Sequence, residues 1–406
     1  MRKTDRTARR GLGLWAAACL LLAALLAAPG SEAAPRIGVL TMEPGEVFFE
    51  RFGHNAIVVD RGDGSEPTSY NFGVFDPTEP DFVARFIAGT MRYRLVALPL
   101  SRDLAQYRAS GRGVRVQWLD LDPEEVQALM AMLAVNARPE NAAYDYQYFT
   151  DNCSTRVRDA LDAATGGLLR RQLTVSSQGI THRMEAVRLA LPAPWMAAGF
   201  HLGLAAEADR PLSRWDEGFI PMRLAESLEG VRRADGRPLV VAVEELLPHR
   251  LTLPPREYPL LRIEAMLLGL ALAIAVVWLG RRAPRVVAGI AGLFWLGAGL
   301  AGLLMAFLWF GTGHHFAHAN ENLFLLSPLA LALLPGAVRA LRGRPPGRVF
   351  EMVLMLVLVL AAFGAFLKLM PFMRQENVEW VFLLLPLHWA LARHFRKLAG
   401  ATRAAG

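Results

Sequence analysis

The sequence predicts an α+β soluble domain followed by an all-α domain with five membrane spans. Two observations lead to this class. Of the 406 residues, 53% are hydrophobic, a fraction too high for an ordinary soluble protein. The apolar excess lies in residues 1–33 and 260–396, whereas residues 34–247 have the mixed composition of a soluble domain. Residues 248–259 contain four prolines and read as a stiff linker between the two parts.

The N-terminal segment predicts export. Five basic residues lie among the first ten, Gly11–Ala28 is apolar, and the small residues Ser31 and Ala33 suit a cut after Ala33. Residues 1–33 are therefore interpreted as a secretory signal peptide or as an uncleaved N-terminal anchor. Both interpretations put the following domain outside the cytoplasm.

Five apolar segments follow the linker, and each is interpreted as a membrane-spanning helix: Leu260–Leu279, Val286–Phe310, Asn322–Val338, Val349–Met370 and Val378–Ala392. A span needs about 20 apolar residues, so the third and fifth segments are short. Arginines gather after the first, third and fifth segments, which puts those loops and the tail 397–406 in the cytoplasm by the positive-inside rule. The soluble domain then lies on the opposite side. Much of the net charge of +7 comes from these arginines, and it predicts no nucleic-acid partner.

The soluble domain is predicted to mix strands and helices. Strands are expected at Phe52–Asp60, Ser69–Phe75, Tyr93–Leu98 and Val114–Leu119, the first two paired as a hairpin. Helices are expected at Asp81–Gly89, after Asp122, and after Asn152. Beyond Gly167 the signals are weak and predict short helices to about Glu245.

Cys153 is the first candidate functional residue, because the other cysteine, Cys19, lies in the N-terminal segment and leaves it no disulfide partner. Asp151 or Asn152 can cap a helix that begins here and ends at Gly166. A thiol in the first turn lies beside free N–H groups and the positive end of the helix dipole, which favour the thiolate. We interpret Cys153 as a nucleophile, the alternative being a small buried core residue.

A thiol nucleophile needs a base, and His54 at the start of a predicted strand is the candidate. Tyr70, Asn71 and Asp76 on the partner strand are candidates for the group that orients the imidazole, the alternative being an aromatic core strand with a polar end. In papain-like folds the cysteine opens a helix and the histidine lies on a strand. The order here, histidine first, is that of circularly permuted papain-like enzymes such as lecithin:retinol acyltransferase. Residues 34–247 are therefore predicted to form a circularly permuted papain-like domain.

Other polar groups near the thiol are candidates for binding a substrate. The backbone N–H of Cys153 and the neighbouring Asn152 are candidates for holding an oxyanion. Arg156 lies one turn further along and is a candidate for stabilising the thiolate or binding a lipid phosphate. An ordinary surface salt bridge is the alternative for this arginine.

A polar loop between the second and third predicted spans is a second candidate site. The residues of interest are His314, His318, Asn320 and Asn322. Their spacing fits no closed zinc motif, so we predict neither a metal nor another cofactor. Polar residues at a membrane boundary suit a lipid headgroup or a substrate entrance, and a plain solvated loop is the alternative.

Three motifs resemble the periplasmic domain of Lnb-type bacterial lipoprotein N-acyltransferases: Phe52-Gly53-His54-Asn55-Ala56, Tyr70-Asn71-Phe72-Gly73 and Asp151-Asn152-Cys153-Ser154-Thr155-Arg156. Thr181-His182-Arg183, Gly218-Phe219-Ile220-Pro221 and the loop ending in Asn320-Glu321-Asn322-Leu323 are similar to later parts of that family. The resemblance covers most of the chain, including the membrane half.

The resemblance implies a multi-pass protein of the bacterial inner membrane, with a periplasmic catalytic domain and a cytoplasmic C-terminus. It further implies that His54 deprotonates Cys153, that the thiolate takes an acyl chain from a membrane phospholipid as a thioester, and that the N-terminal amine of a diacylated lipoprotein accepts the chain. Two alternatives stand beside this function. One is a membrane-anchored cysteine hydrolase (a peptidase, amidase or phospholipase) with water as the acceptor. The other is a non-catalytic membrane protein in which Cys153 is structural.

Overall fold

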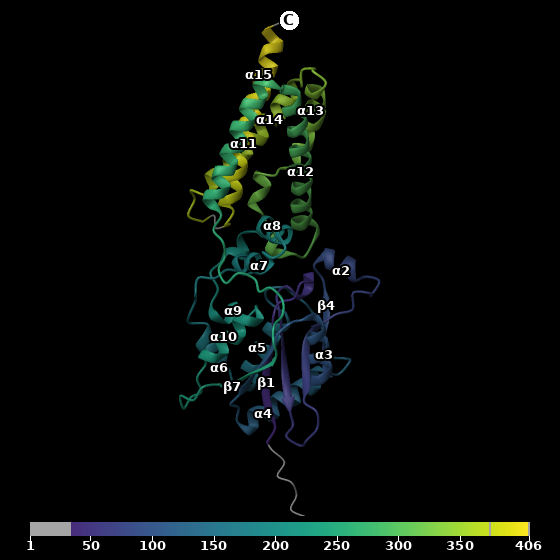
Figure 1. Cartoon of the computed structure of the whole chain (residues 1–406), viewed down its shortest axis with the longest axis vertical. Coiled ribbons are helices and arrows are strands. Elements are labelled where there is room, and N and C mark those ends of the chain that lie inside the picture. The colour runs from purple at the N-terminus through teal and green to yellow at the C-terminus, as the bar shows by residue number, and fades with distance from the viewer. Residues whose placement is uncertain (1–33, 373–374, 405–406) are drawn as a thin grey trace, which may run out of the picture.

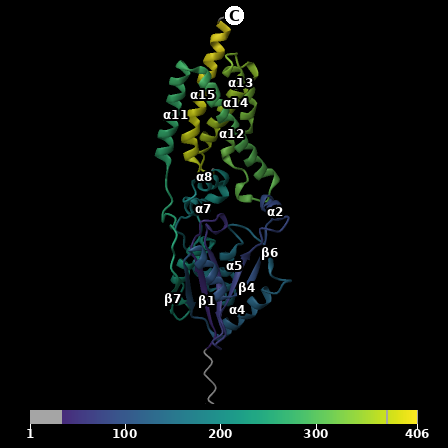
Figure 2. The same ribbon diagram turned by 45° about the vertical axis from the view of Figure 1, so that its right-hand side comes forward.

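The computed structural model of the protein describes residues 34–372 and 375–404. Figure 1 shows an elongated molecule with a sheet-containing part at one end and a bundle of long helices at the other, and the turned view in Figure 2 agrees. The predicted signal or anchor, residues 1–33, lies outside the described residues.

A seven-stranded sheet forms the centre of the first part, in the order β6-β4-β3-β2-β1-β5-β7. All neighbouring strands are antiparallel. The strands are β1 (Arg36–Met42), β2 (His54–Asp60), β3 (Thr68–Val74), β4 (Arg92–Pro99), β5 (Val114–Leu119), β6 (Ala143–Asp145) and β7 (Val240–Leu247). The predicted hairpin is confirmed as β2–β3, in which Ile57 pairs with Tyr70.

Helices cover both faces of this sheet. Helix α5 (Cys153–Ala164) packs on the face that carries Ile57 and Val59, and helix α3 (Leu100–Ser110) packs on the face that carries Ala56 and Val58. The other short helices of this part are η1 (Phe48–Glu50), α2 (Phe82–Ala88), α4 (Pro123–Asn136), α6 (Leu168–Leu173), α7 (His182–Ala190), α8 (Pro194–Gly203), η2 (Ala206–Asp209), α9 (Arg214–Glu217) and α10 (Pro221–Gly230). The predicted mixture of strands and helices is confirmed.

The prediction of short helices up to about Glu245 is wrong at its C-terminal end, where the structure has β7. Residues 240–247 form an edge strand on β5 rather than a short helix. Their middle residues are exposed, so the alternation of apolar and polar residues that marks a half-buried strand is absent. Pairing with β5 therefore decides the conformation here, and a local pattern does not.

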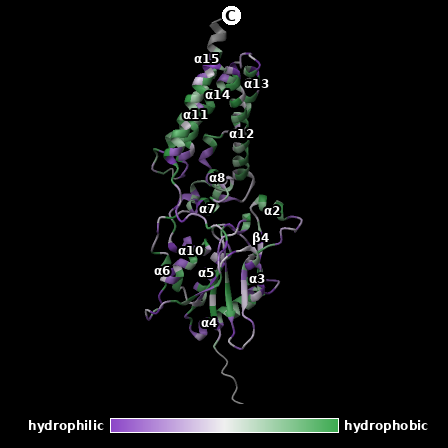
Figure 3. Cartoon of the chain, in the orientation of Figure 1, coloured by the Kyte–Doolittle hydropathy of each residue, from purple (hydrophilic) through white to green (hydrophobic). Residues whose placement is uncertain are grey.

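Three helices of the second part are long and apolar enough to cross a membrane: α11 (Arg262–Arg282), α12 (Pro284–Gly311) and α14 (Arg348–Leu367). They correspond to the first, second and fourth predicted spans. Figure 3 shows the hydrophobic colour concentrated along these helices, whereas the sheet-containing part is mixed.

The third predicted span is not one helix. Residues 315–341 form two stretches bent by 40°, which together are apolar enough for one broken span. Their elements are η3 (His315–Ala317), η4 (Glu321–Phe324), η5 (Pro328–Leu333) and α13 (Leu334–Leu341). Ser327 caps the second stretch immediately before Pro328, and a proline has no N–H with which to continue a preceding helix.

Helix α15 (Val378–Ala404) corresponds to the fifth predicted span but is not among the helices that reach the hydropathy needed for a span within the described residues. It packs along α11 and α14. A Cβ added to Gly269 or Gly280 of α11 would collide with α15, so these glycines allow the two helices to approach closely. The fifth span stays a prediction.

The two parts touch through α2, α8 and the loop that follows α12. Gly313 donates its N–H to the carbonyl of Ala88 at 2.8 Å, and Ala205 donates its N–H to the carbonyl of Phe316 at 2.6 Å. In Figures 1 and 2, α2, α7 and α8 lie between the sheet and the long helices. The sheet-containing part is therefore held against one end of the helical bundle.

Candidate active site

Cys153 is the first residue of α5, and its side chain is 8% exposed. Asn152 caps the helix, because its Oδ1 accepts hydrogen bonds from the N–H groups of Ser154 and Thr155, both at 2.9 Å. The Asn152 amide donates to two backbone carbonyl groups, at 2.8 and 2.9 Å. The structure therefore uses the whole Asn152 side chain to hold the helix start, and leaves none of its N–H groups for an oxyanion.

A direct contact between β2 and α5 sets the spacing at the site. The Ser154 hydroxyl lies 2.8 Å from Oδ1 of Asn55 and 2.6 Å from the carbonyl of Gly218. The Asn55 amide donates in turn to the carbonyl of Leu40 at 3.1 Å. Asn55 and Ser154 are the chain neighbours of His54 and Cys153, so the backbone fixes how far apart the imidazole and the thiol lie.

His54 begins β2, and its imidazole lies near enough to the Cys153 thiol that each group shifts the pKa of the other. Its Nε2 lies 3.1 Å from Oδ1 of Asn71, and Nδ2 of Asn71 donates to Oδ2 of Asp103 at 2.7 Å. A carboxylate only accepts, so Asn71 must present its oxygen to His54. Nε2 of the imidazole then carries a proton, which leaves Nδ1 for the sulfur. Hydrogen bonds therefore run in one direction from Asp103 through Asn71 to His54, and the Cys153 thiol lies beside the imidazole.

The charges of the thiol and the imidazole depend on each other. Burial raises the pKa of the Cys153 thiol, but the His54 charge and the hydrogen bonds from His54 and from the Asn55 and Ser154 N–H groups outweigh burial and lower it. Burial lowers the pKa of His54, whereas the Cys153 thiolate raises it, and the net shift is upward. The positive charge of Arg112 lowers the pKa of His54 and so opposes the effect of the thiolate. Each group therefore stabilises the charged form of the other, and the thiolate is favoured at a lower pH than for an ordinary thiol.

The pH dependence of alkylation tests this coupling. We expect the rate at which iodoacetamide modifies Cys153 to stay high at pH values below the ordinary thiol pKa. The rate should fall only when the pH drops below the lowered pKa of this thiol, where the thiolate becomes protonated. In His54→Ala, the strongest of the effects that oppose burial is lost, so the thiol pKa rises and alkylation near pH 7 falls by about tenfold or more. The rates are measured on the full-length protein by mass spectrometry. Identical pH profiles for the two proteins would contradict the coupling.

Asp103 should act through Asn71. Asp103→Asn removes the carboxylate that fixes the Asn71 amide, so a fraction of molecules will present the Asn71 N–H groups to His54. We expect the alkylation rate of Cys153 to drop about tenfold and the free energy of unfolding to fall by about 2 kcal/mol, because hydrogen bonds to a charged group are lost. Asp145→Asn, at an exposed carboxylate on β6, is the control and should change neither quantity. A normal alkylation rate in a folded Asp103→Asn protein would disprove the orienting role.

The structure separates the three candidates for the orienting group. Asn71 contacts His54, whereas Tyr70 lies on the opposite face of β3, buried in the cluster that packs against α5. Asp76 is exposed and accepts hydrogen bonds from Thr78. The structure therefore brings Asn71 to His54 and leaves Tyr70 as a core residue.

Arg156 lies beside the site without touching the thiol. It forms an ion pair with Asp151, and its guanidinium stacks on the ring of Tyr144 at 4.3 Å. For Arg156, the alternative to a contact with the thiolate or a lipid phosphate is an ordinary surface salt bridge, and the ion pair with Asp151 agrees with it. The stacking on Tyr144 is a contact that the sequence pattern does not indicate.

Gly73 and Tyr144 are further residues of the site that sequence reasoning missed. Gly73 has φ +86°, and a Cβ placed on it would lie 3.3 Å from Cβ of Cys153 and 3.7 Å from the hydroxyl of Tyr144. Within the described part of the chain, that buried hydroxyl has no hydrogen-bond partner. Burial, and then the charge of Cys153, raise the pKa of Tyr144, so the phenol stays protonated and able to donate. The Tyr-x-Tyr-x-Tyr spacing of residues 144–148 is the only local signal that could have singled it out.

Comparison with known proteins identifies the architecture. Residues 33–190 match the Lnb N-terminal periplasmic domain, and residues 259–395 match the Lnb transmembrane domain. The chain belongs to the Lnb family. No curated protein and no solved structure matches it. Family membership makes this a membrane-anchored protein with a periplasmic N-terminal domain, and it indicates an enzyme of the lipoprotein N-acyltransferase type.

The polar loop of the Lnb transmembrane domain, residues 313–322, does not reach the thiol through the residues that were singled out. Nε2 of His314 donates to the carbonyl of Phe86 in α2 at 3.1 Å, and Nε2 of His318 lies 3.1 Å from the carbonyl of Thr312. Asn320 and Asn322 donate to the carbonyl of Leu202, at 2.8 and 2.9 Å. These side chains hold the loop in place and fasten it to the periplasmic domain.

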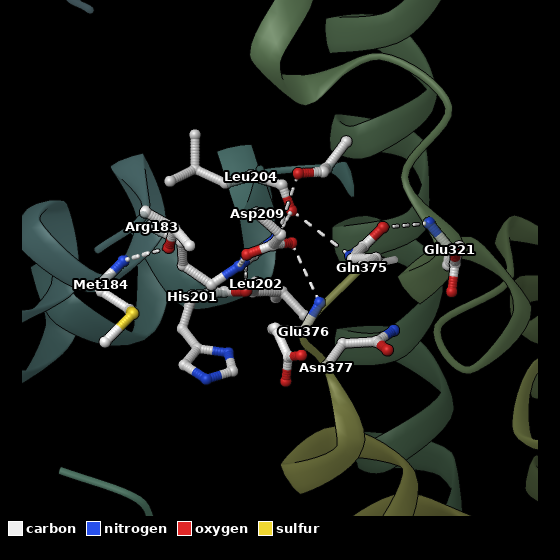
Figure 4. A network of polar contacts seen from close by, with 12 residues as sticks. Arg183, Met184, His201, Leu202, Leu204, Asp209, Glu321, Gln375, Glu376 and Asn377 are labelled. Carbon is white, nitrogen blue, oxygen red and sulfur yellow. Dashed lines mark hydrogen bonds and ion pairs between the residues drawn. The ribbon is translucent and has the colours of Figure 1, made fainter. Parts of the chain in front are cut away.

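A buried network completes this fastening (Figure 4). Arg183 donates to both carboxylate oxygens of Asp209, at 2.7 and 2.8 Å, and the two side chains are 1% and 0% exposed. Asp209 accepts the N–H of Glu376, at 2.9 Å, from the loop before α15. Gln375 joins the same network through Oδ1 of Asn320, at 2.9 Å. The Lnb periplasmic and transmembrane domains therefore share a buried polar contact.

Two cavities lie in the Lnb transmembrane domain, lined by residues that are away from this site. One of about 470 Å³ is lined by Met355 and Leu358 of α14 and by Trp389, Arg393 and Lys397 of α15. Among the described residues, no three His, Cys, Asp or Glu side chains are placed to hold a metal ion. The candidate chemistry of the chain therefore centres on the Cys153 thiol.

Proposed function

We propose that the protein is a lipoprotein N-acyltransferase of the inner membrane, which moves an acyl chain from a phospholipid to the N-terminal amine of a diacylated lipoprotein. The proposal is supported by the hydrogen bonds that join Asp103, Asn71 and His54, by the mutual pKa shifts of His54 and Cys153, and by the fastening of this domain against apolar helices. A five-span membrane domain, a papain-like periplasmic domain and a cytoplasmic C-terminus are parts of the same proposal.

In the first half-reaction, the Cys153 thiolate attacks the ester carbonyl of a phospholipid. His54, held as imidazolium, gives its Nδ1 proton to the departing glycerol oxygen, so that a lysophospholipid leaves and an acyl thioester remains. In the second half-reaction, neutral His54 takes a proton from the attacking lipoprotein amine. The C–S bond breaks, the amide forms, and the thiolate–imidazolium pair is restored.

The negative charge that develops on the carbonyl oxygen needs donors. The backbone N–H of Cys153 is one, because within the described residues no acceptor is recorded for it. The Tyr144 hydroxyl is the second donor that we propose, since it is buried, protonated and without a partner beside Gly73. The Arg156 guanidinium on the Tyr144 ring makes the phenol a better donor.

Tyr144→Phe should lower kcat by about a hundredfold and leave the alkylation rate of Cys153 unchanged, because the hydroxyl acts on the carbonyl oxygen and not on the sulfur. Tyr148→Phe is the matched control, since Tyr148 is 36% exposed and its hydroxyl donates to the sulfur of Met91, so that this hydroxyl should be dispensable. Steady-state acyl transfer and iodoacetamide kinetics measure the two quantities. Equal transfer rates for Tyr144→Phe and the wild type would exclude this donor.

The proposed function is tested with the full-length protein in nanodiscs that contain a phospholipid with a labelled acyl chain, to which a diacylated lipopeptide is added. The expected products are N-acylated lipopeptide and lysophospholipid in equal amounts. Release of labelled free fatty acid without amide would favour a phospholipase instead. Neither product, from a protein whose Cys153 reacts with iodoacetamide, would count against a lipid substrate.

A further inference from the structure

The structure contains an aromatic surface that the reaction chemistry does not explain. It consists of Phe49, Phe75, Phe82 and Phe86, and we call it the aromatic surface. The ring centroids of Phe49 lie 4.9 Å from Phe75 and 6.1 Å from both Phe82 and Phe86. Phe49 is 42% exposed, and the other three rings are only partly buried. Clustered aromatic rings that stay open to solvent are typical of a binding surface rather than of a core.

This surface continues into exposed aliphatic side chains on α2. Val83 is 62% exposed and Ile87 is 49% exposed. The charged residue between them, Arg85, forms ion pairs with Glu79 and Asp81. The outer side of α2 is therefore apolar although it is not covered by any described residue of the chain.

The position of α2 indicates what covers it. The loop after α12 holds the end of α2, through the bond from Gly313 to Ala88 and the contact of His314 with Phe86. Helix α12 ends two residues before Gly313, and its last aromatic residues, Trp309 and Phe310, are 37% and 77% exposed. Aromatic residues at the end of an apolar helix mark the level of the membrane interface. Helix α2 is therefore fixed at the height of the bilayer surface, where lipid is the available apolar partner.

The aromatic surface also leads toward the thiol. The ring centroid of Phe75 lies 4.7 Å from that of Tyr93, and Tyr93 lies 4.3 Å from Tyr146. An edge carbon of Tyr146 would lie 3.6 Å from a Cβ on Gly73, the residue that faces Cys153. Ring contacts thus connect α2, at the bilayer surface, with the wall of the proposed acylation site.

We propose that the outer side of α2 and the aromatic surface bind the acyl chain of a phospholipid as it leaves the outer leaflet of the membrane. Apolar side chains at the interface replace part of the lipid environment that the chain gives up, and the row of rings guides the ester toward Cys153. This inference rests on the proposed function for the fate of the ester, whereas lipid binding by this surface does not require that any acyl transfer take place.

The test uses the full-length Cys153→Ser protein in nanodiscs of phosphatidylethanolamine and phosphatidylglycerol, doped with a phosphatidylethanolamine that carries a photoreactive diazirine in one acyl chain. After illumination, cross-linked peptides are mapped by mass spectrometry. We expect cross-links on residues 82–88 and on the peptide that contains Phe49, in addition to those on the long helices. Cross-links confined to the long helices would overturn the proposal.

Variants make the test specific. Val83→Asp and Ile87→Asp, made together, place charges on the outer side of α2 and should lower the cross-link yield there by about tenfold. Val135→Asp is the matched control, because Val135 is 44% exposed on α4, at the end of the domain away from the long helices (Figure 1). Val83→Ile should retain the yield. An unchanged yield in the double Asp variant would overturn the proposal. A loss of cross-links that extends to the long helices would indicate misfolding, and Val83→Ile is then compared with Val83→Thr. In that comparison the proposal requires a lower yield in the Thr variant.

A parallel measurement of the acyl thioester on the protein with Cys153 intact separates this inference from the proposed function. Cross-links on α2 in a protein that makes no acyl thioester when Cys153 is intact would leave the lipid surface standing and reject the transferase. An acyl thioester on Cys153 without cross-links on α2 would support the transferase and reject this surface.

Discussion

Replacing Cys153 by serine should abolish acyl transfer. We expect kcat to fall by about four orders of magnitude, because a serine hydroxyl beside His54 stays protonated at neutral pH and is a much weaker nucleophile than the thiolate. The labelled thioester should disappear together with the N-acylated lipopeptide. Trapping the acyl-enzyme on wild-type protein without acceptor, followed by hydroxylamine release, measures the intermediate directly.

A folded control makes this result interpretable. Ser and Cys differ little in volume, and Cys153 packs at the start of a helix that Asn152 and Ser154 hold independently of the sulfur. Cys153→Ser should therefore unfold at the same temperature as the wild type. Residual transfer above about 1% of the wild-type rate, in protein free of wild-type contamination, would contradict a covalent mechanism.

Removing the carboxylate of Asp209 should give the largest loss of stability. In Asp209→Ala, the guanidinium of Arg183 stays buried with no opposite charge, and the N–H of Glu376 loses its acceptor. Breaking a buried ion pair in this way costs about 3–5 kcal/mol. We expect a lower unfolding temperature of the full-length protein and faster proteolysis of the loop before α15, because the contact between the two domains weakens (Figure 4).

Glu207 offers a matched control on the same short helix. Its pair with Arg210 is 43% and 64% exposed on the two side chains, and an exposed pair of this kind contributes about 0–1 kcal/mol. Glu207→Ala should therefore leave the unfolding temperature nearly unchanged. Equal effects of the two substitutions would show that the buried pair does not hold the domains together.

The parts of the fold that the sequence predicts well are those with strong local signals. A cap at Asp122, Pro123 at the first helical position and acids in the first turn predict α4, and the structure confirms this helix and adds a capping box between Asp122 and Glu125. The hairpin β2–β3 is predicted by two apolar runs on either side of a turn. Local hydrogen-bonding groups determine these elements, so a short stretch of sequence is enough to predict them.

Other parts depend on contacts between distant residues. The strand β7 is ordered by pairing with β5, although its own residues are mostly exposed. Hydropathy counts apolar residues but not backbone hydrogen bonds, so it predicts a single third span where Ser327 and Pro328 divide it. These features arise from the folded chain rather than from a local pattern.

The residues of the candidate site also fall into those that a local sequence pattern predicts and those that only the folded chain brings together. A cysteine at a helix start and a histidine at a strand start are recognisable from the sequence, because both lie in polar motifs beside regular elements. The sequence does not decide which of Tyr70, Asn71 and Asp76 orients the imidazole. Side chains alternate between the two faces of the folded β3, and this alternation points Asn71 and not Tyr70 toward His54. Asp103 could not be found, because its contact with Asn71 joins residues 32 positions apart and no motif marks α3.

The contact of Asn55 with Ser154 also has a consequence for biogenesis. These residues are 99 positions apart, so the imidazole meets the thiol only after most of the domain has folded. An unfolded chain in transit through the membrane carries a thiol with an ordinary pKa, which is mostly protonated and reacts slowly with oxidants. Folding lowers the pKa of the Cys153 thiol in the same step that buries the residue to 8% exposure, so the oxidation-sensitive thiolate is favoured only in the folded protein. If Cys153 is the nucleophile that we propose, it becomes reactive only after it is shielded from solvent.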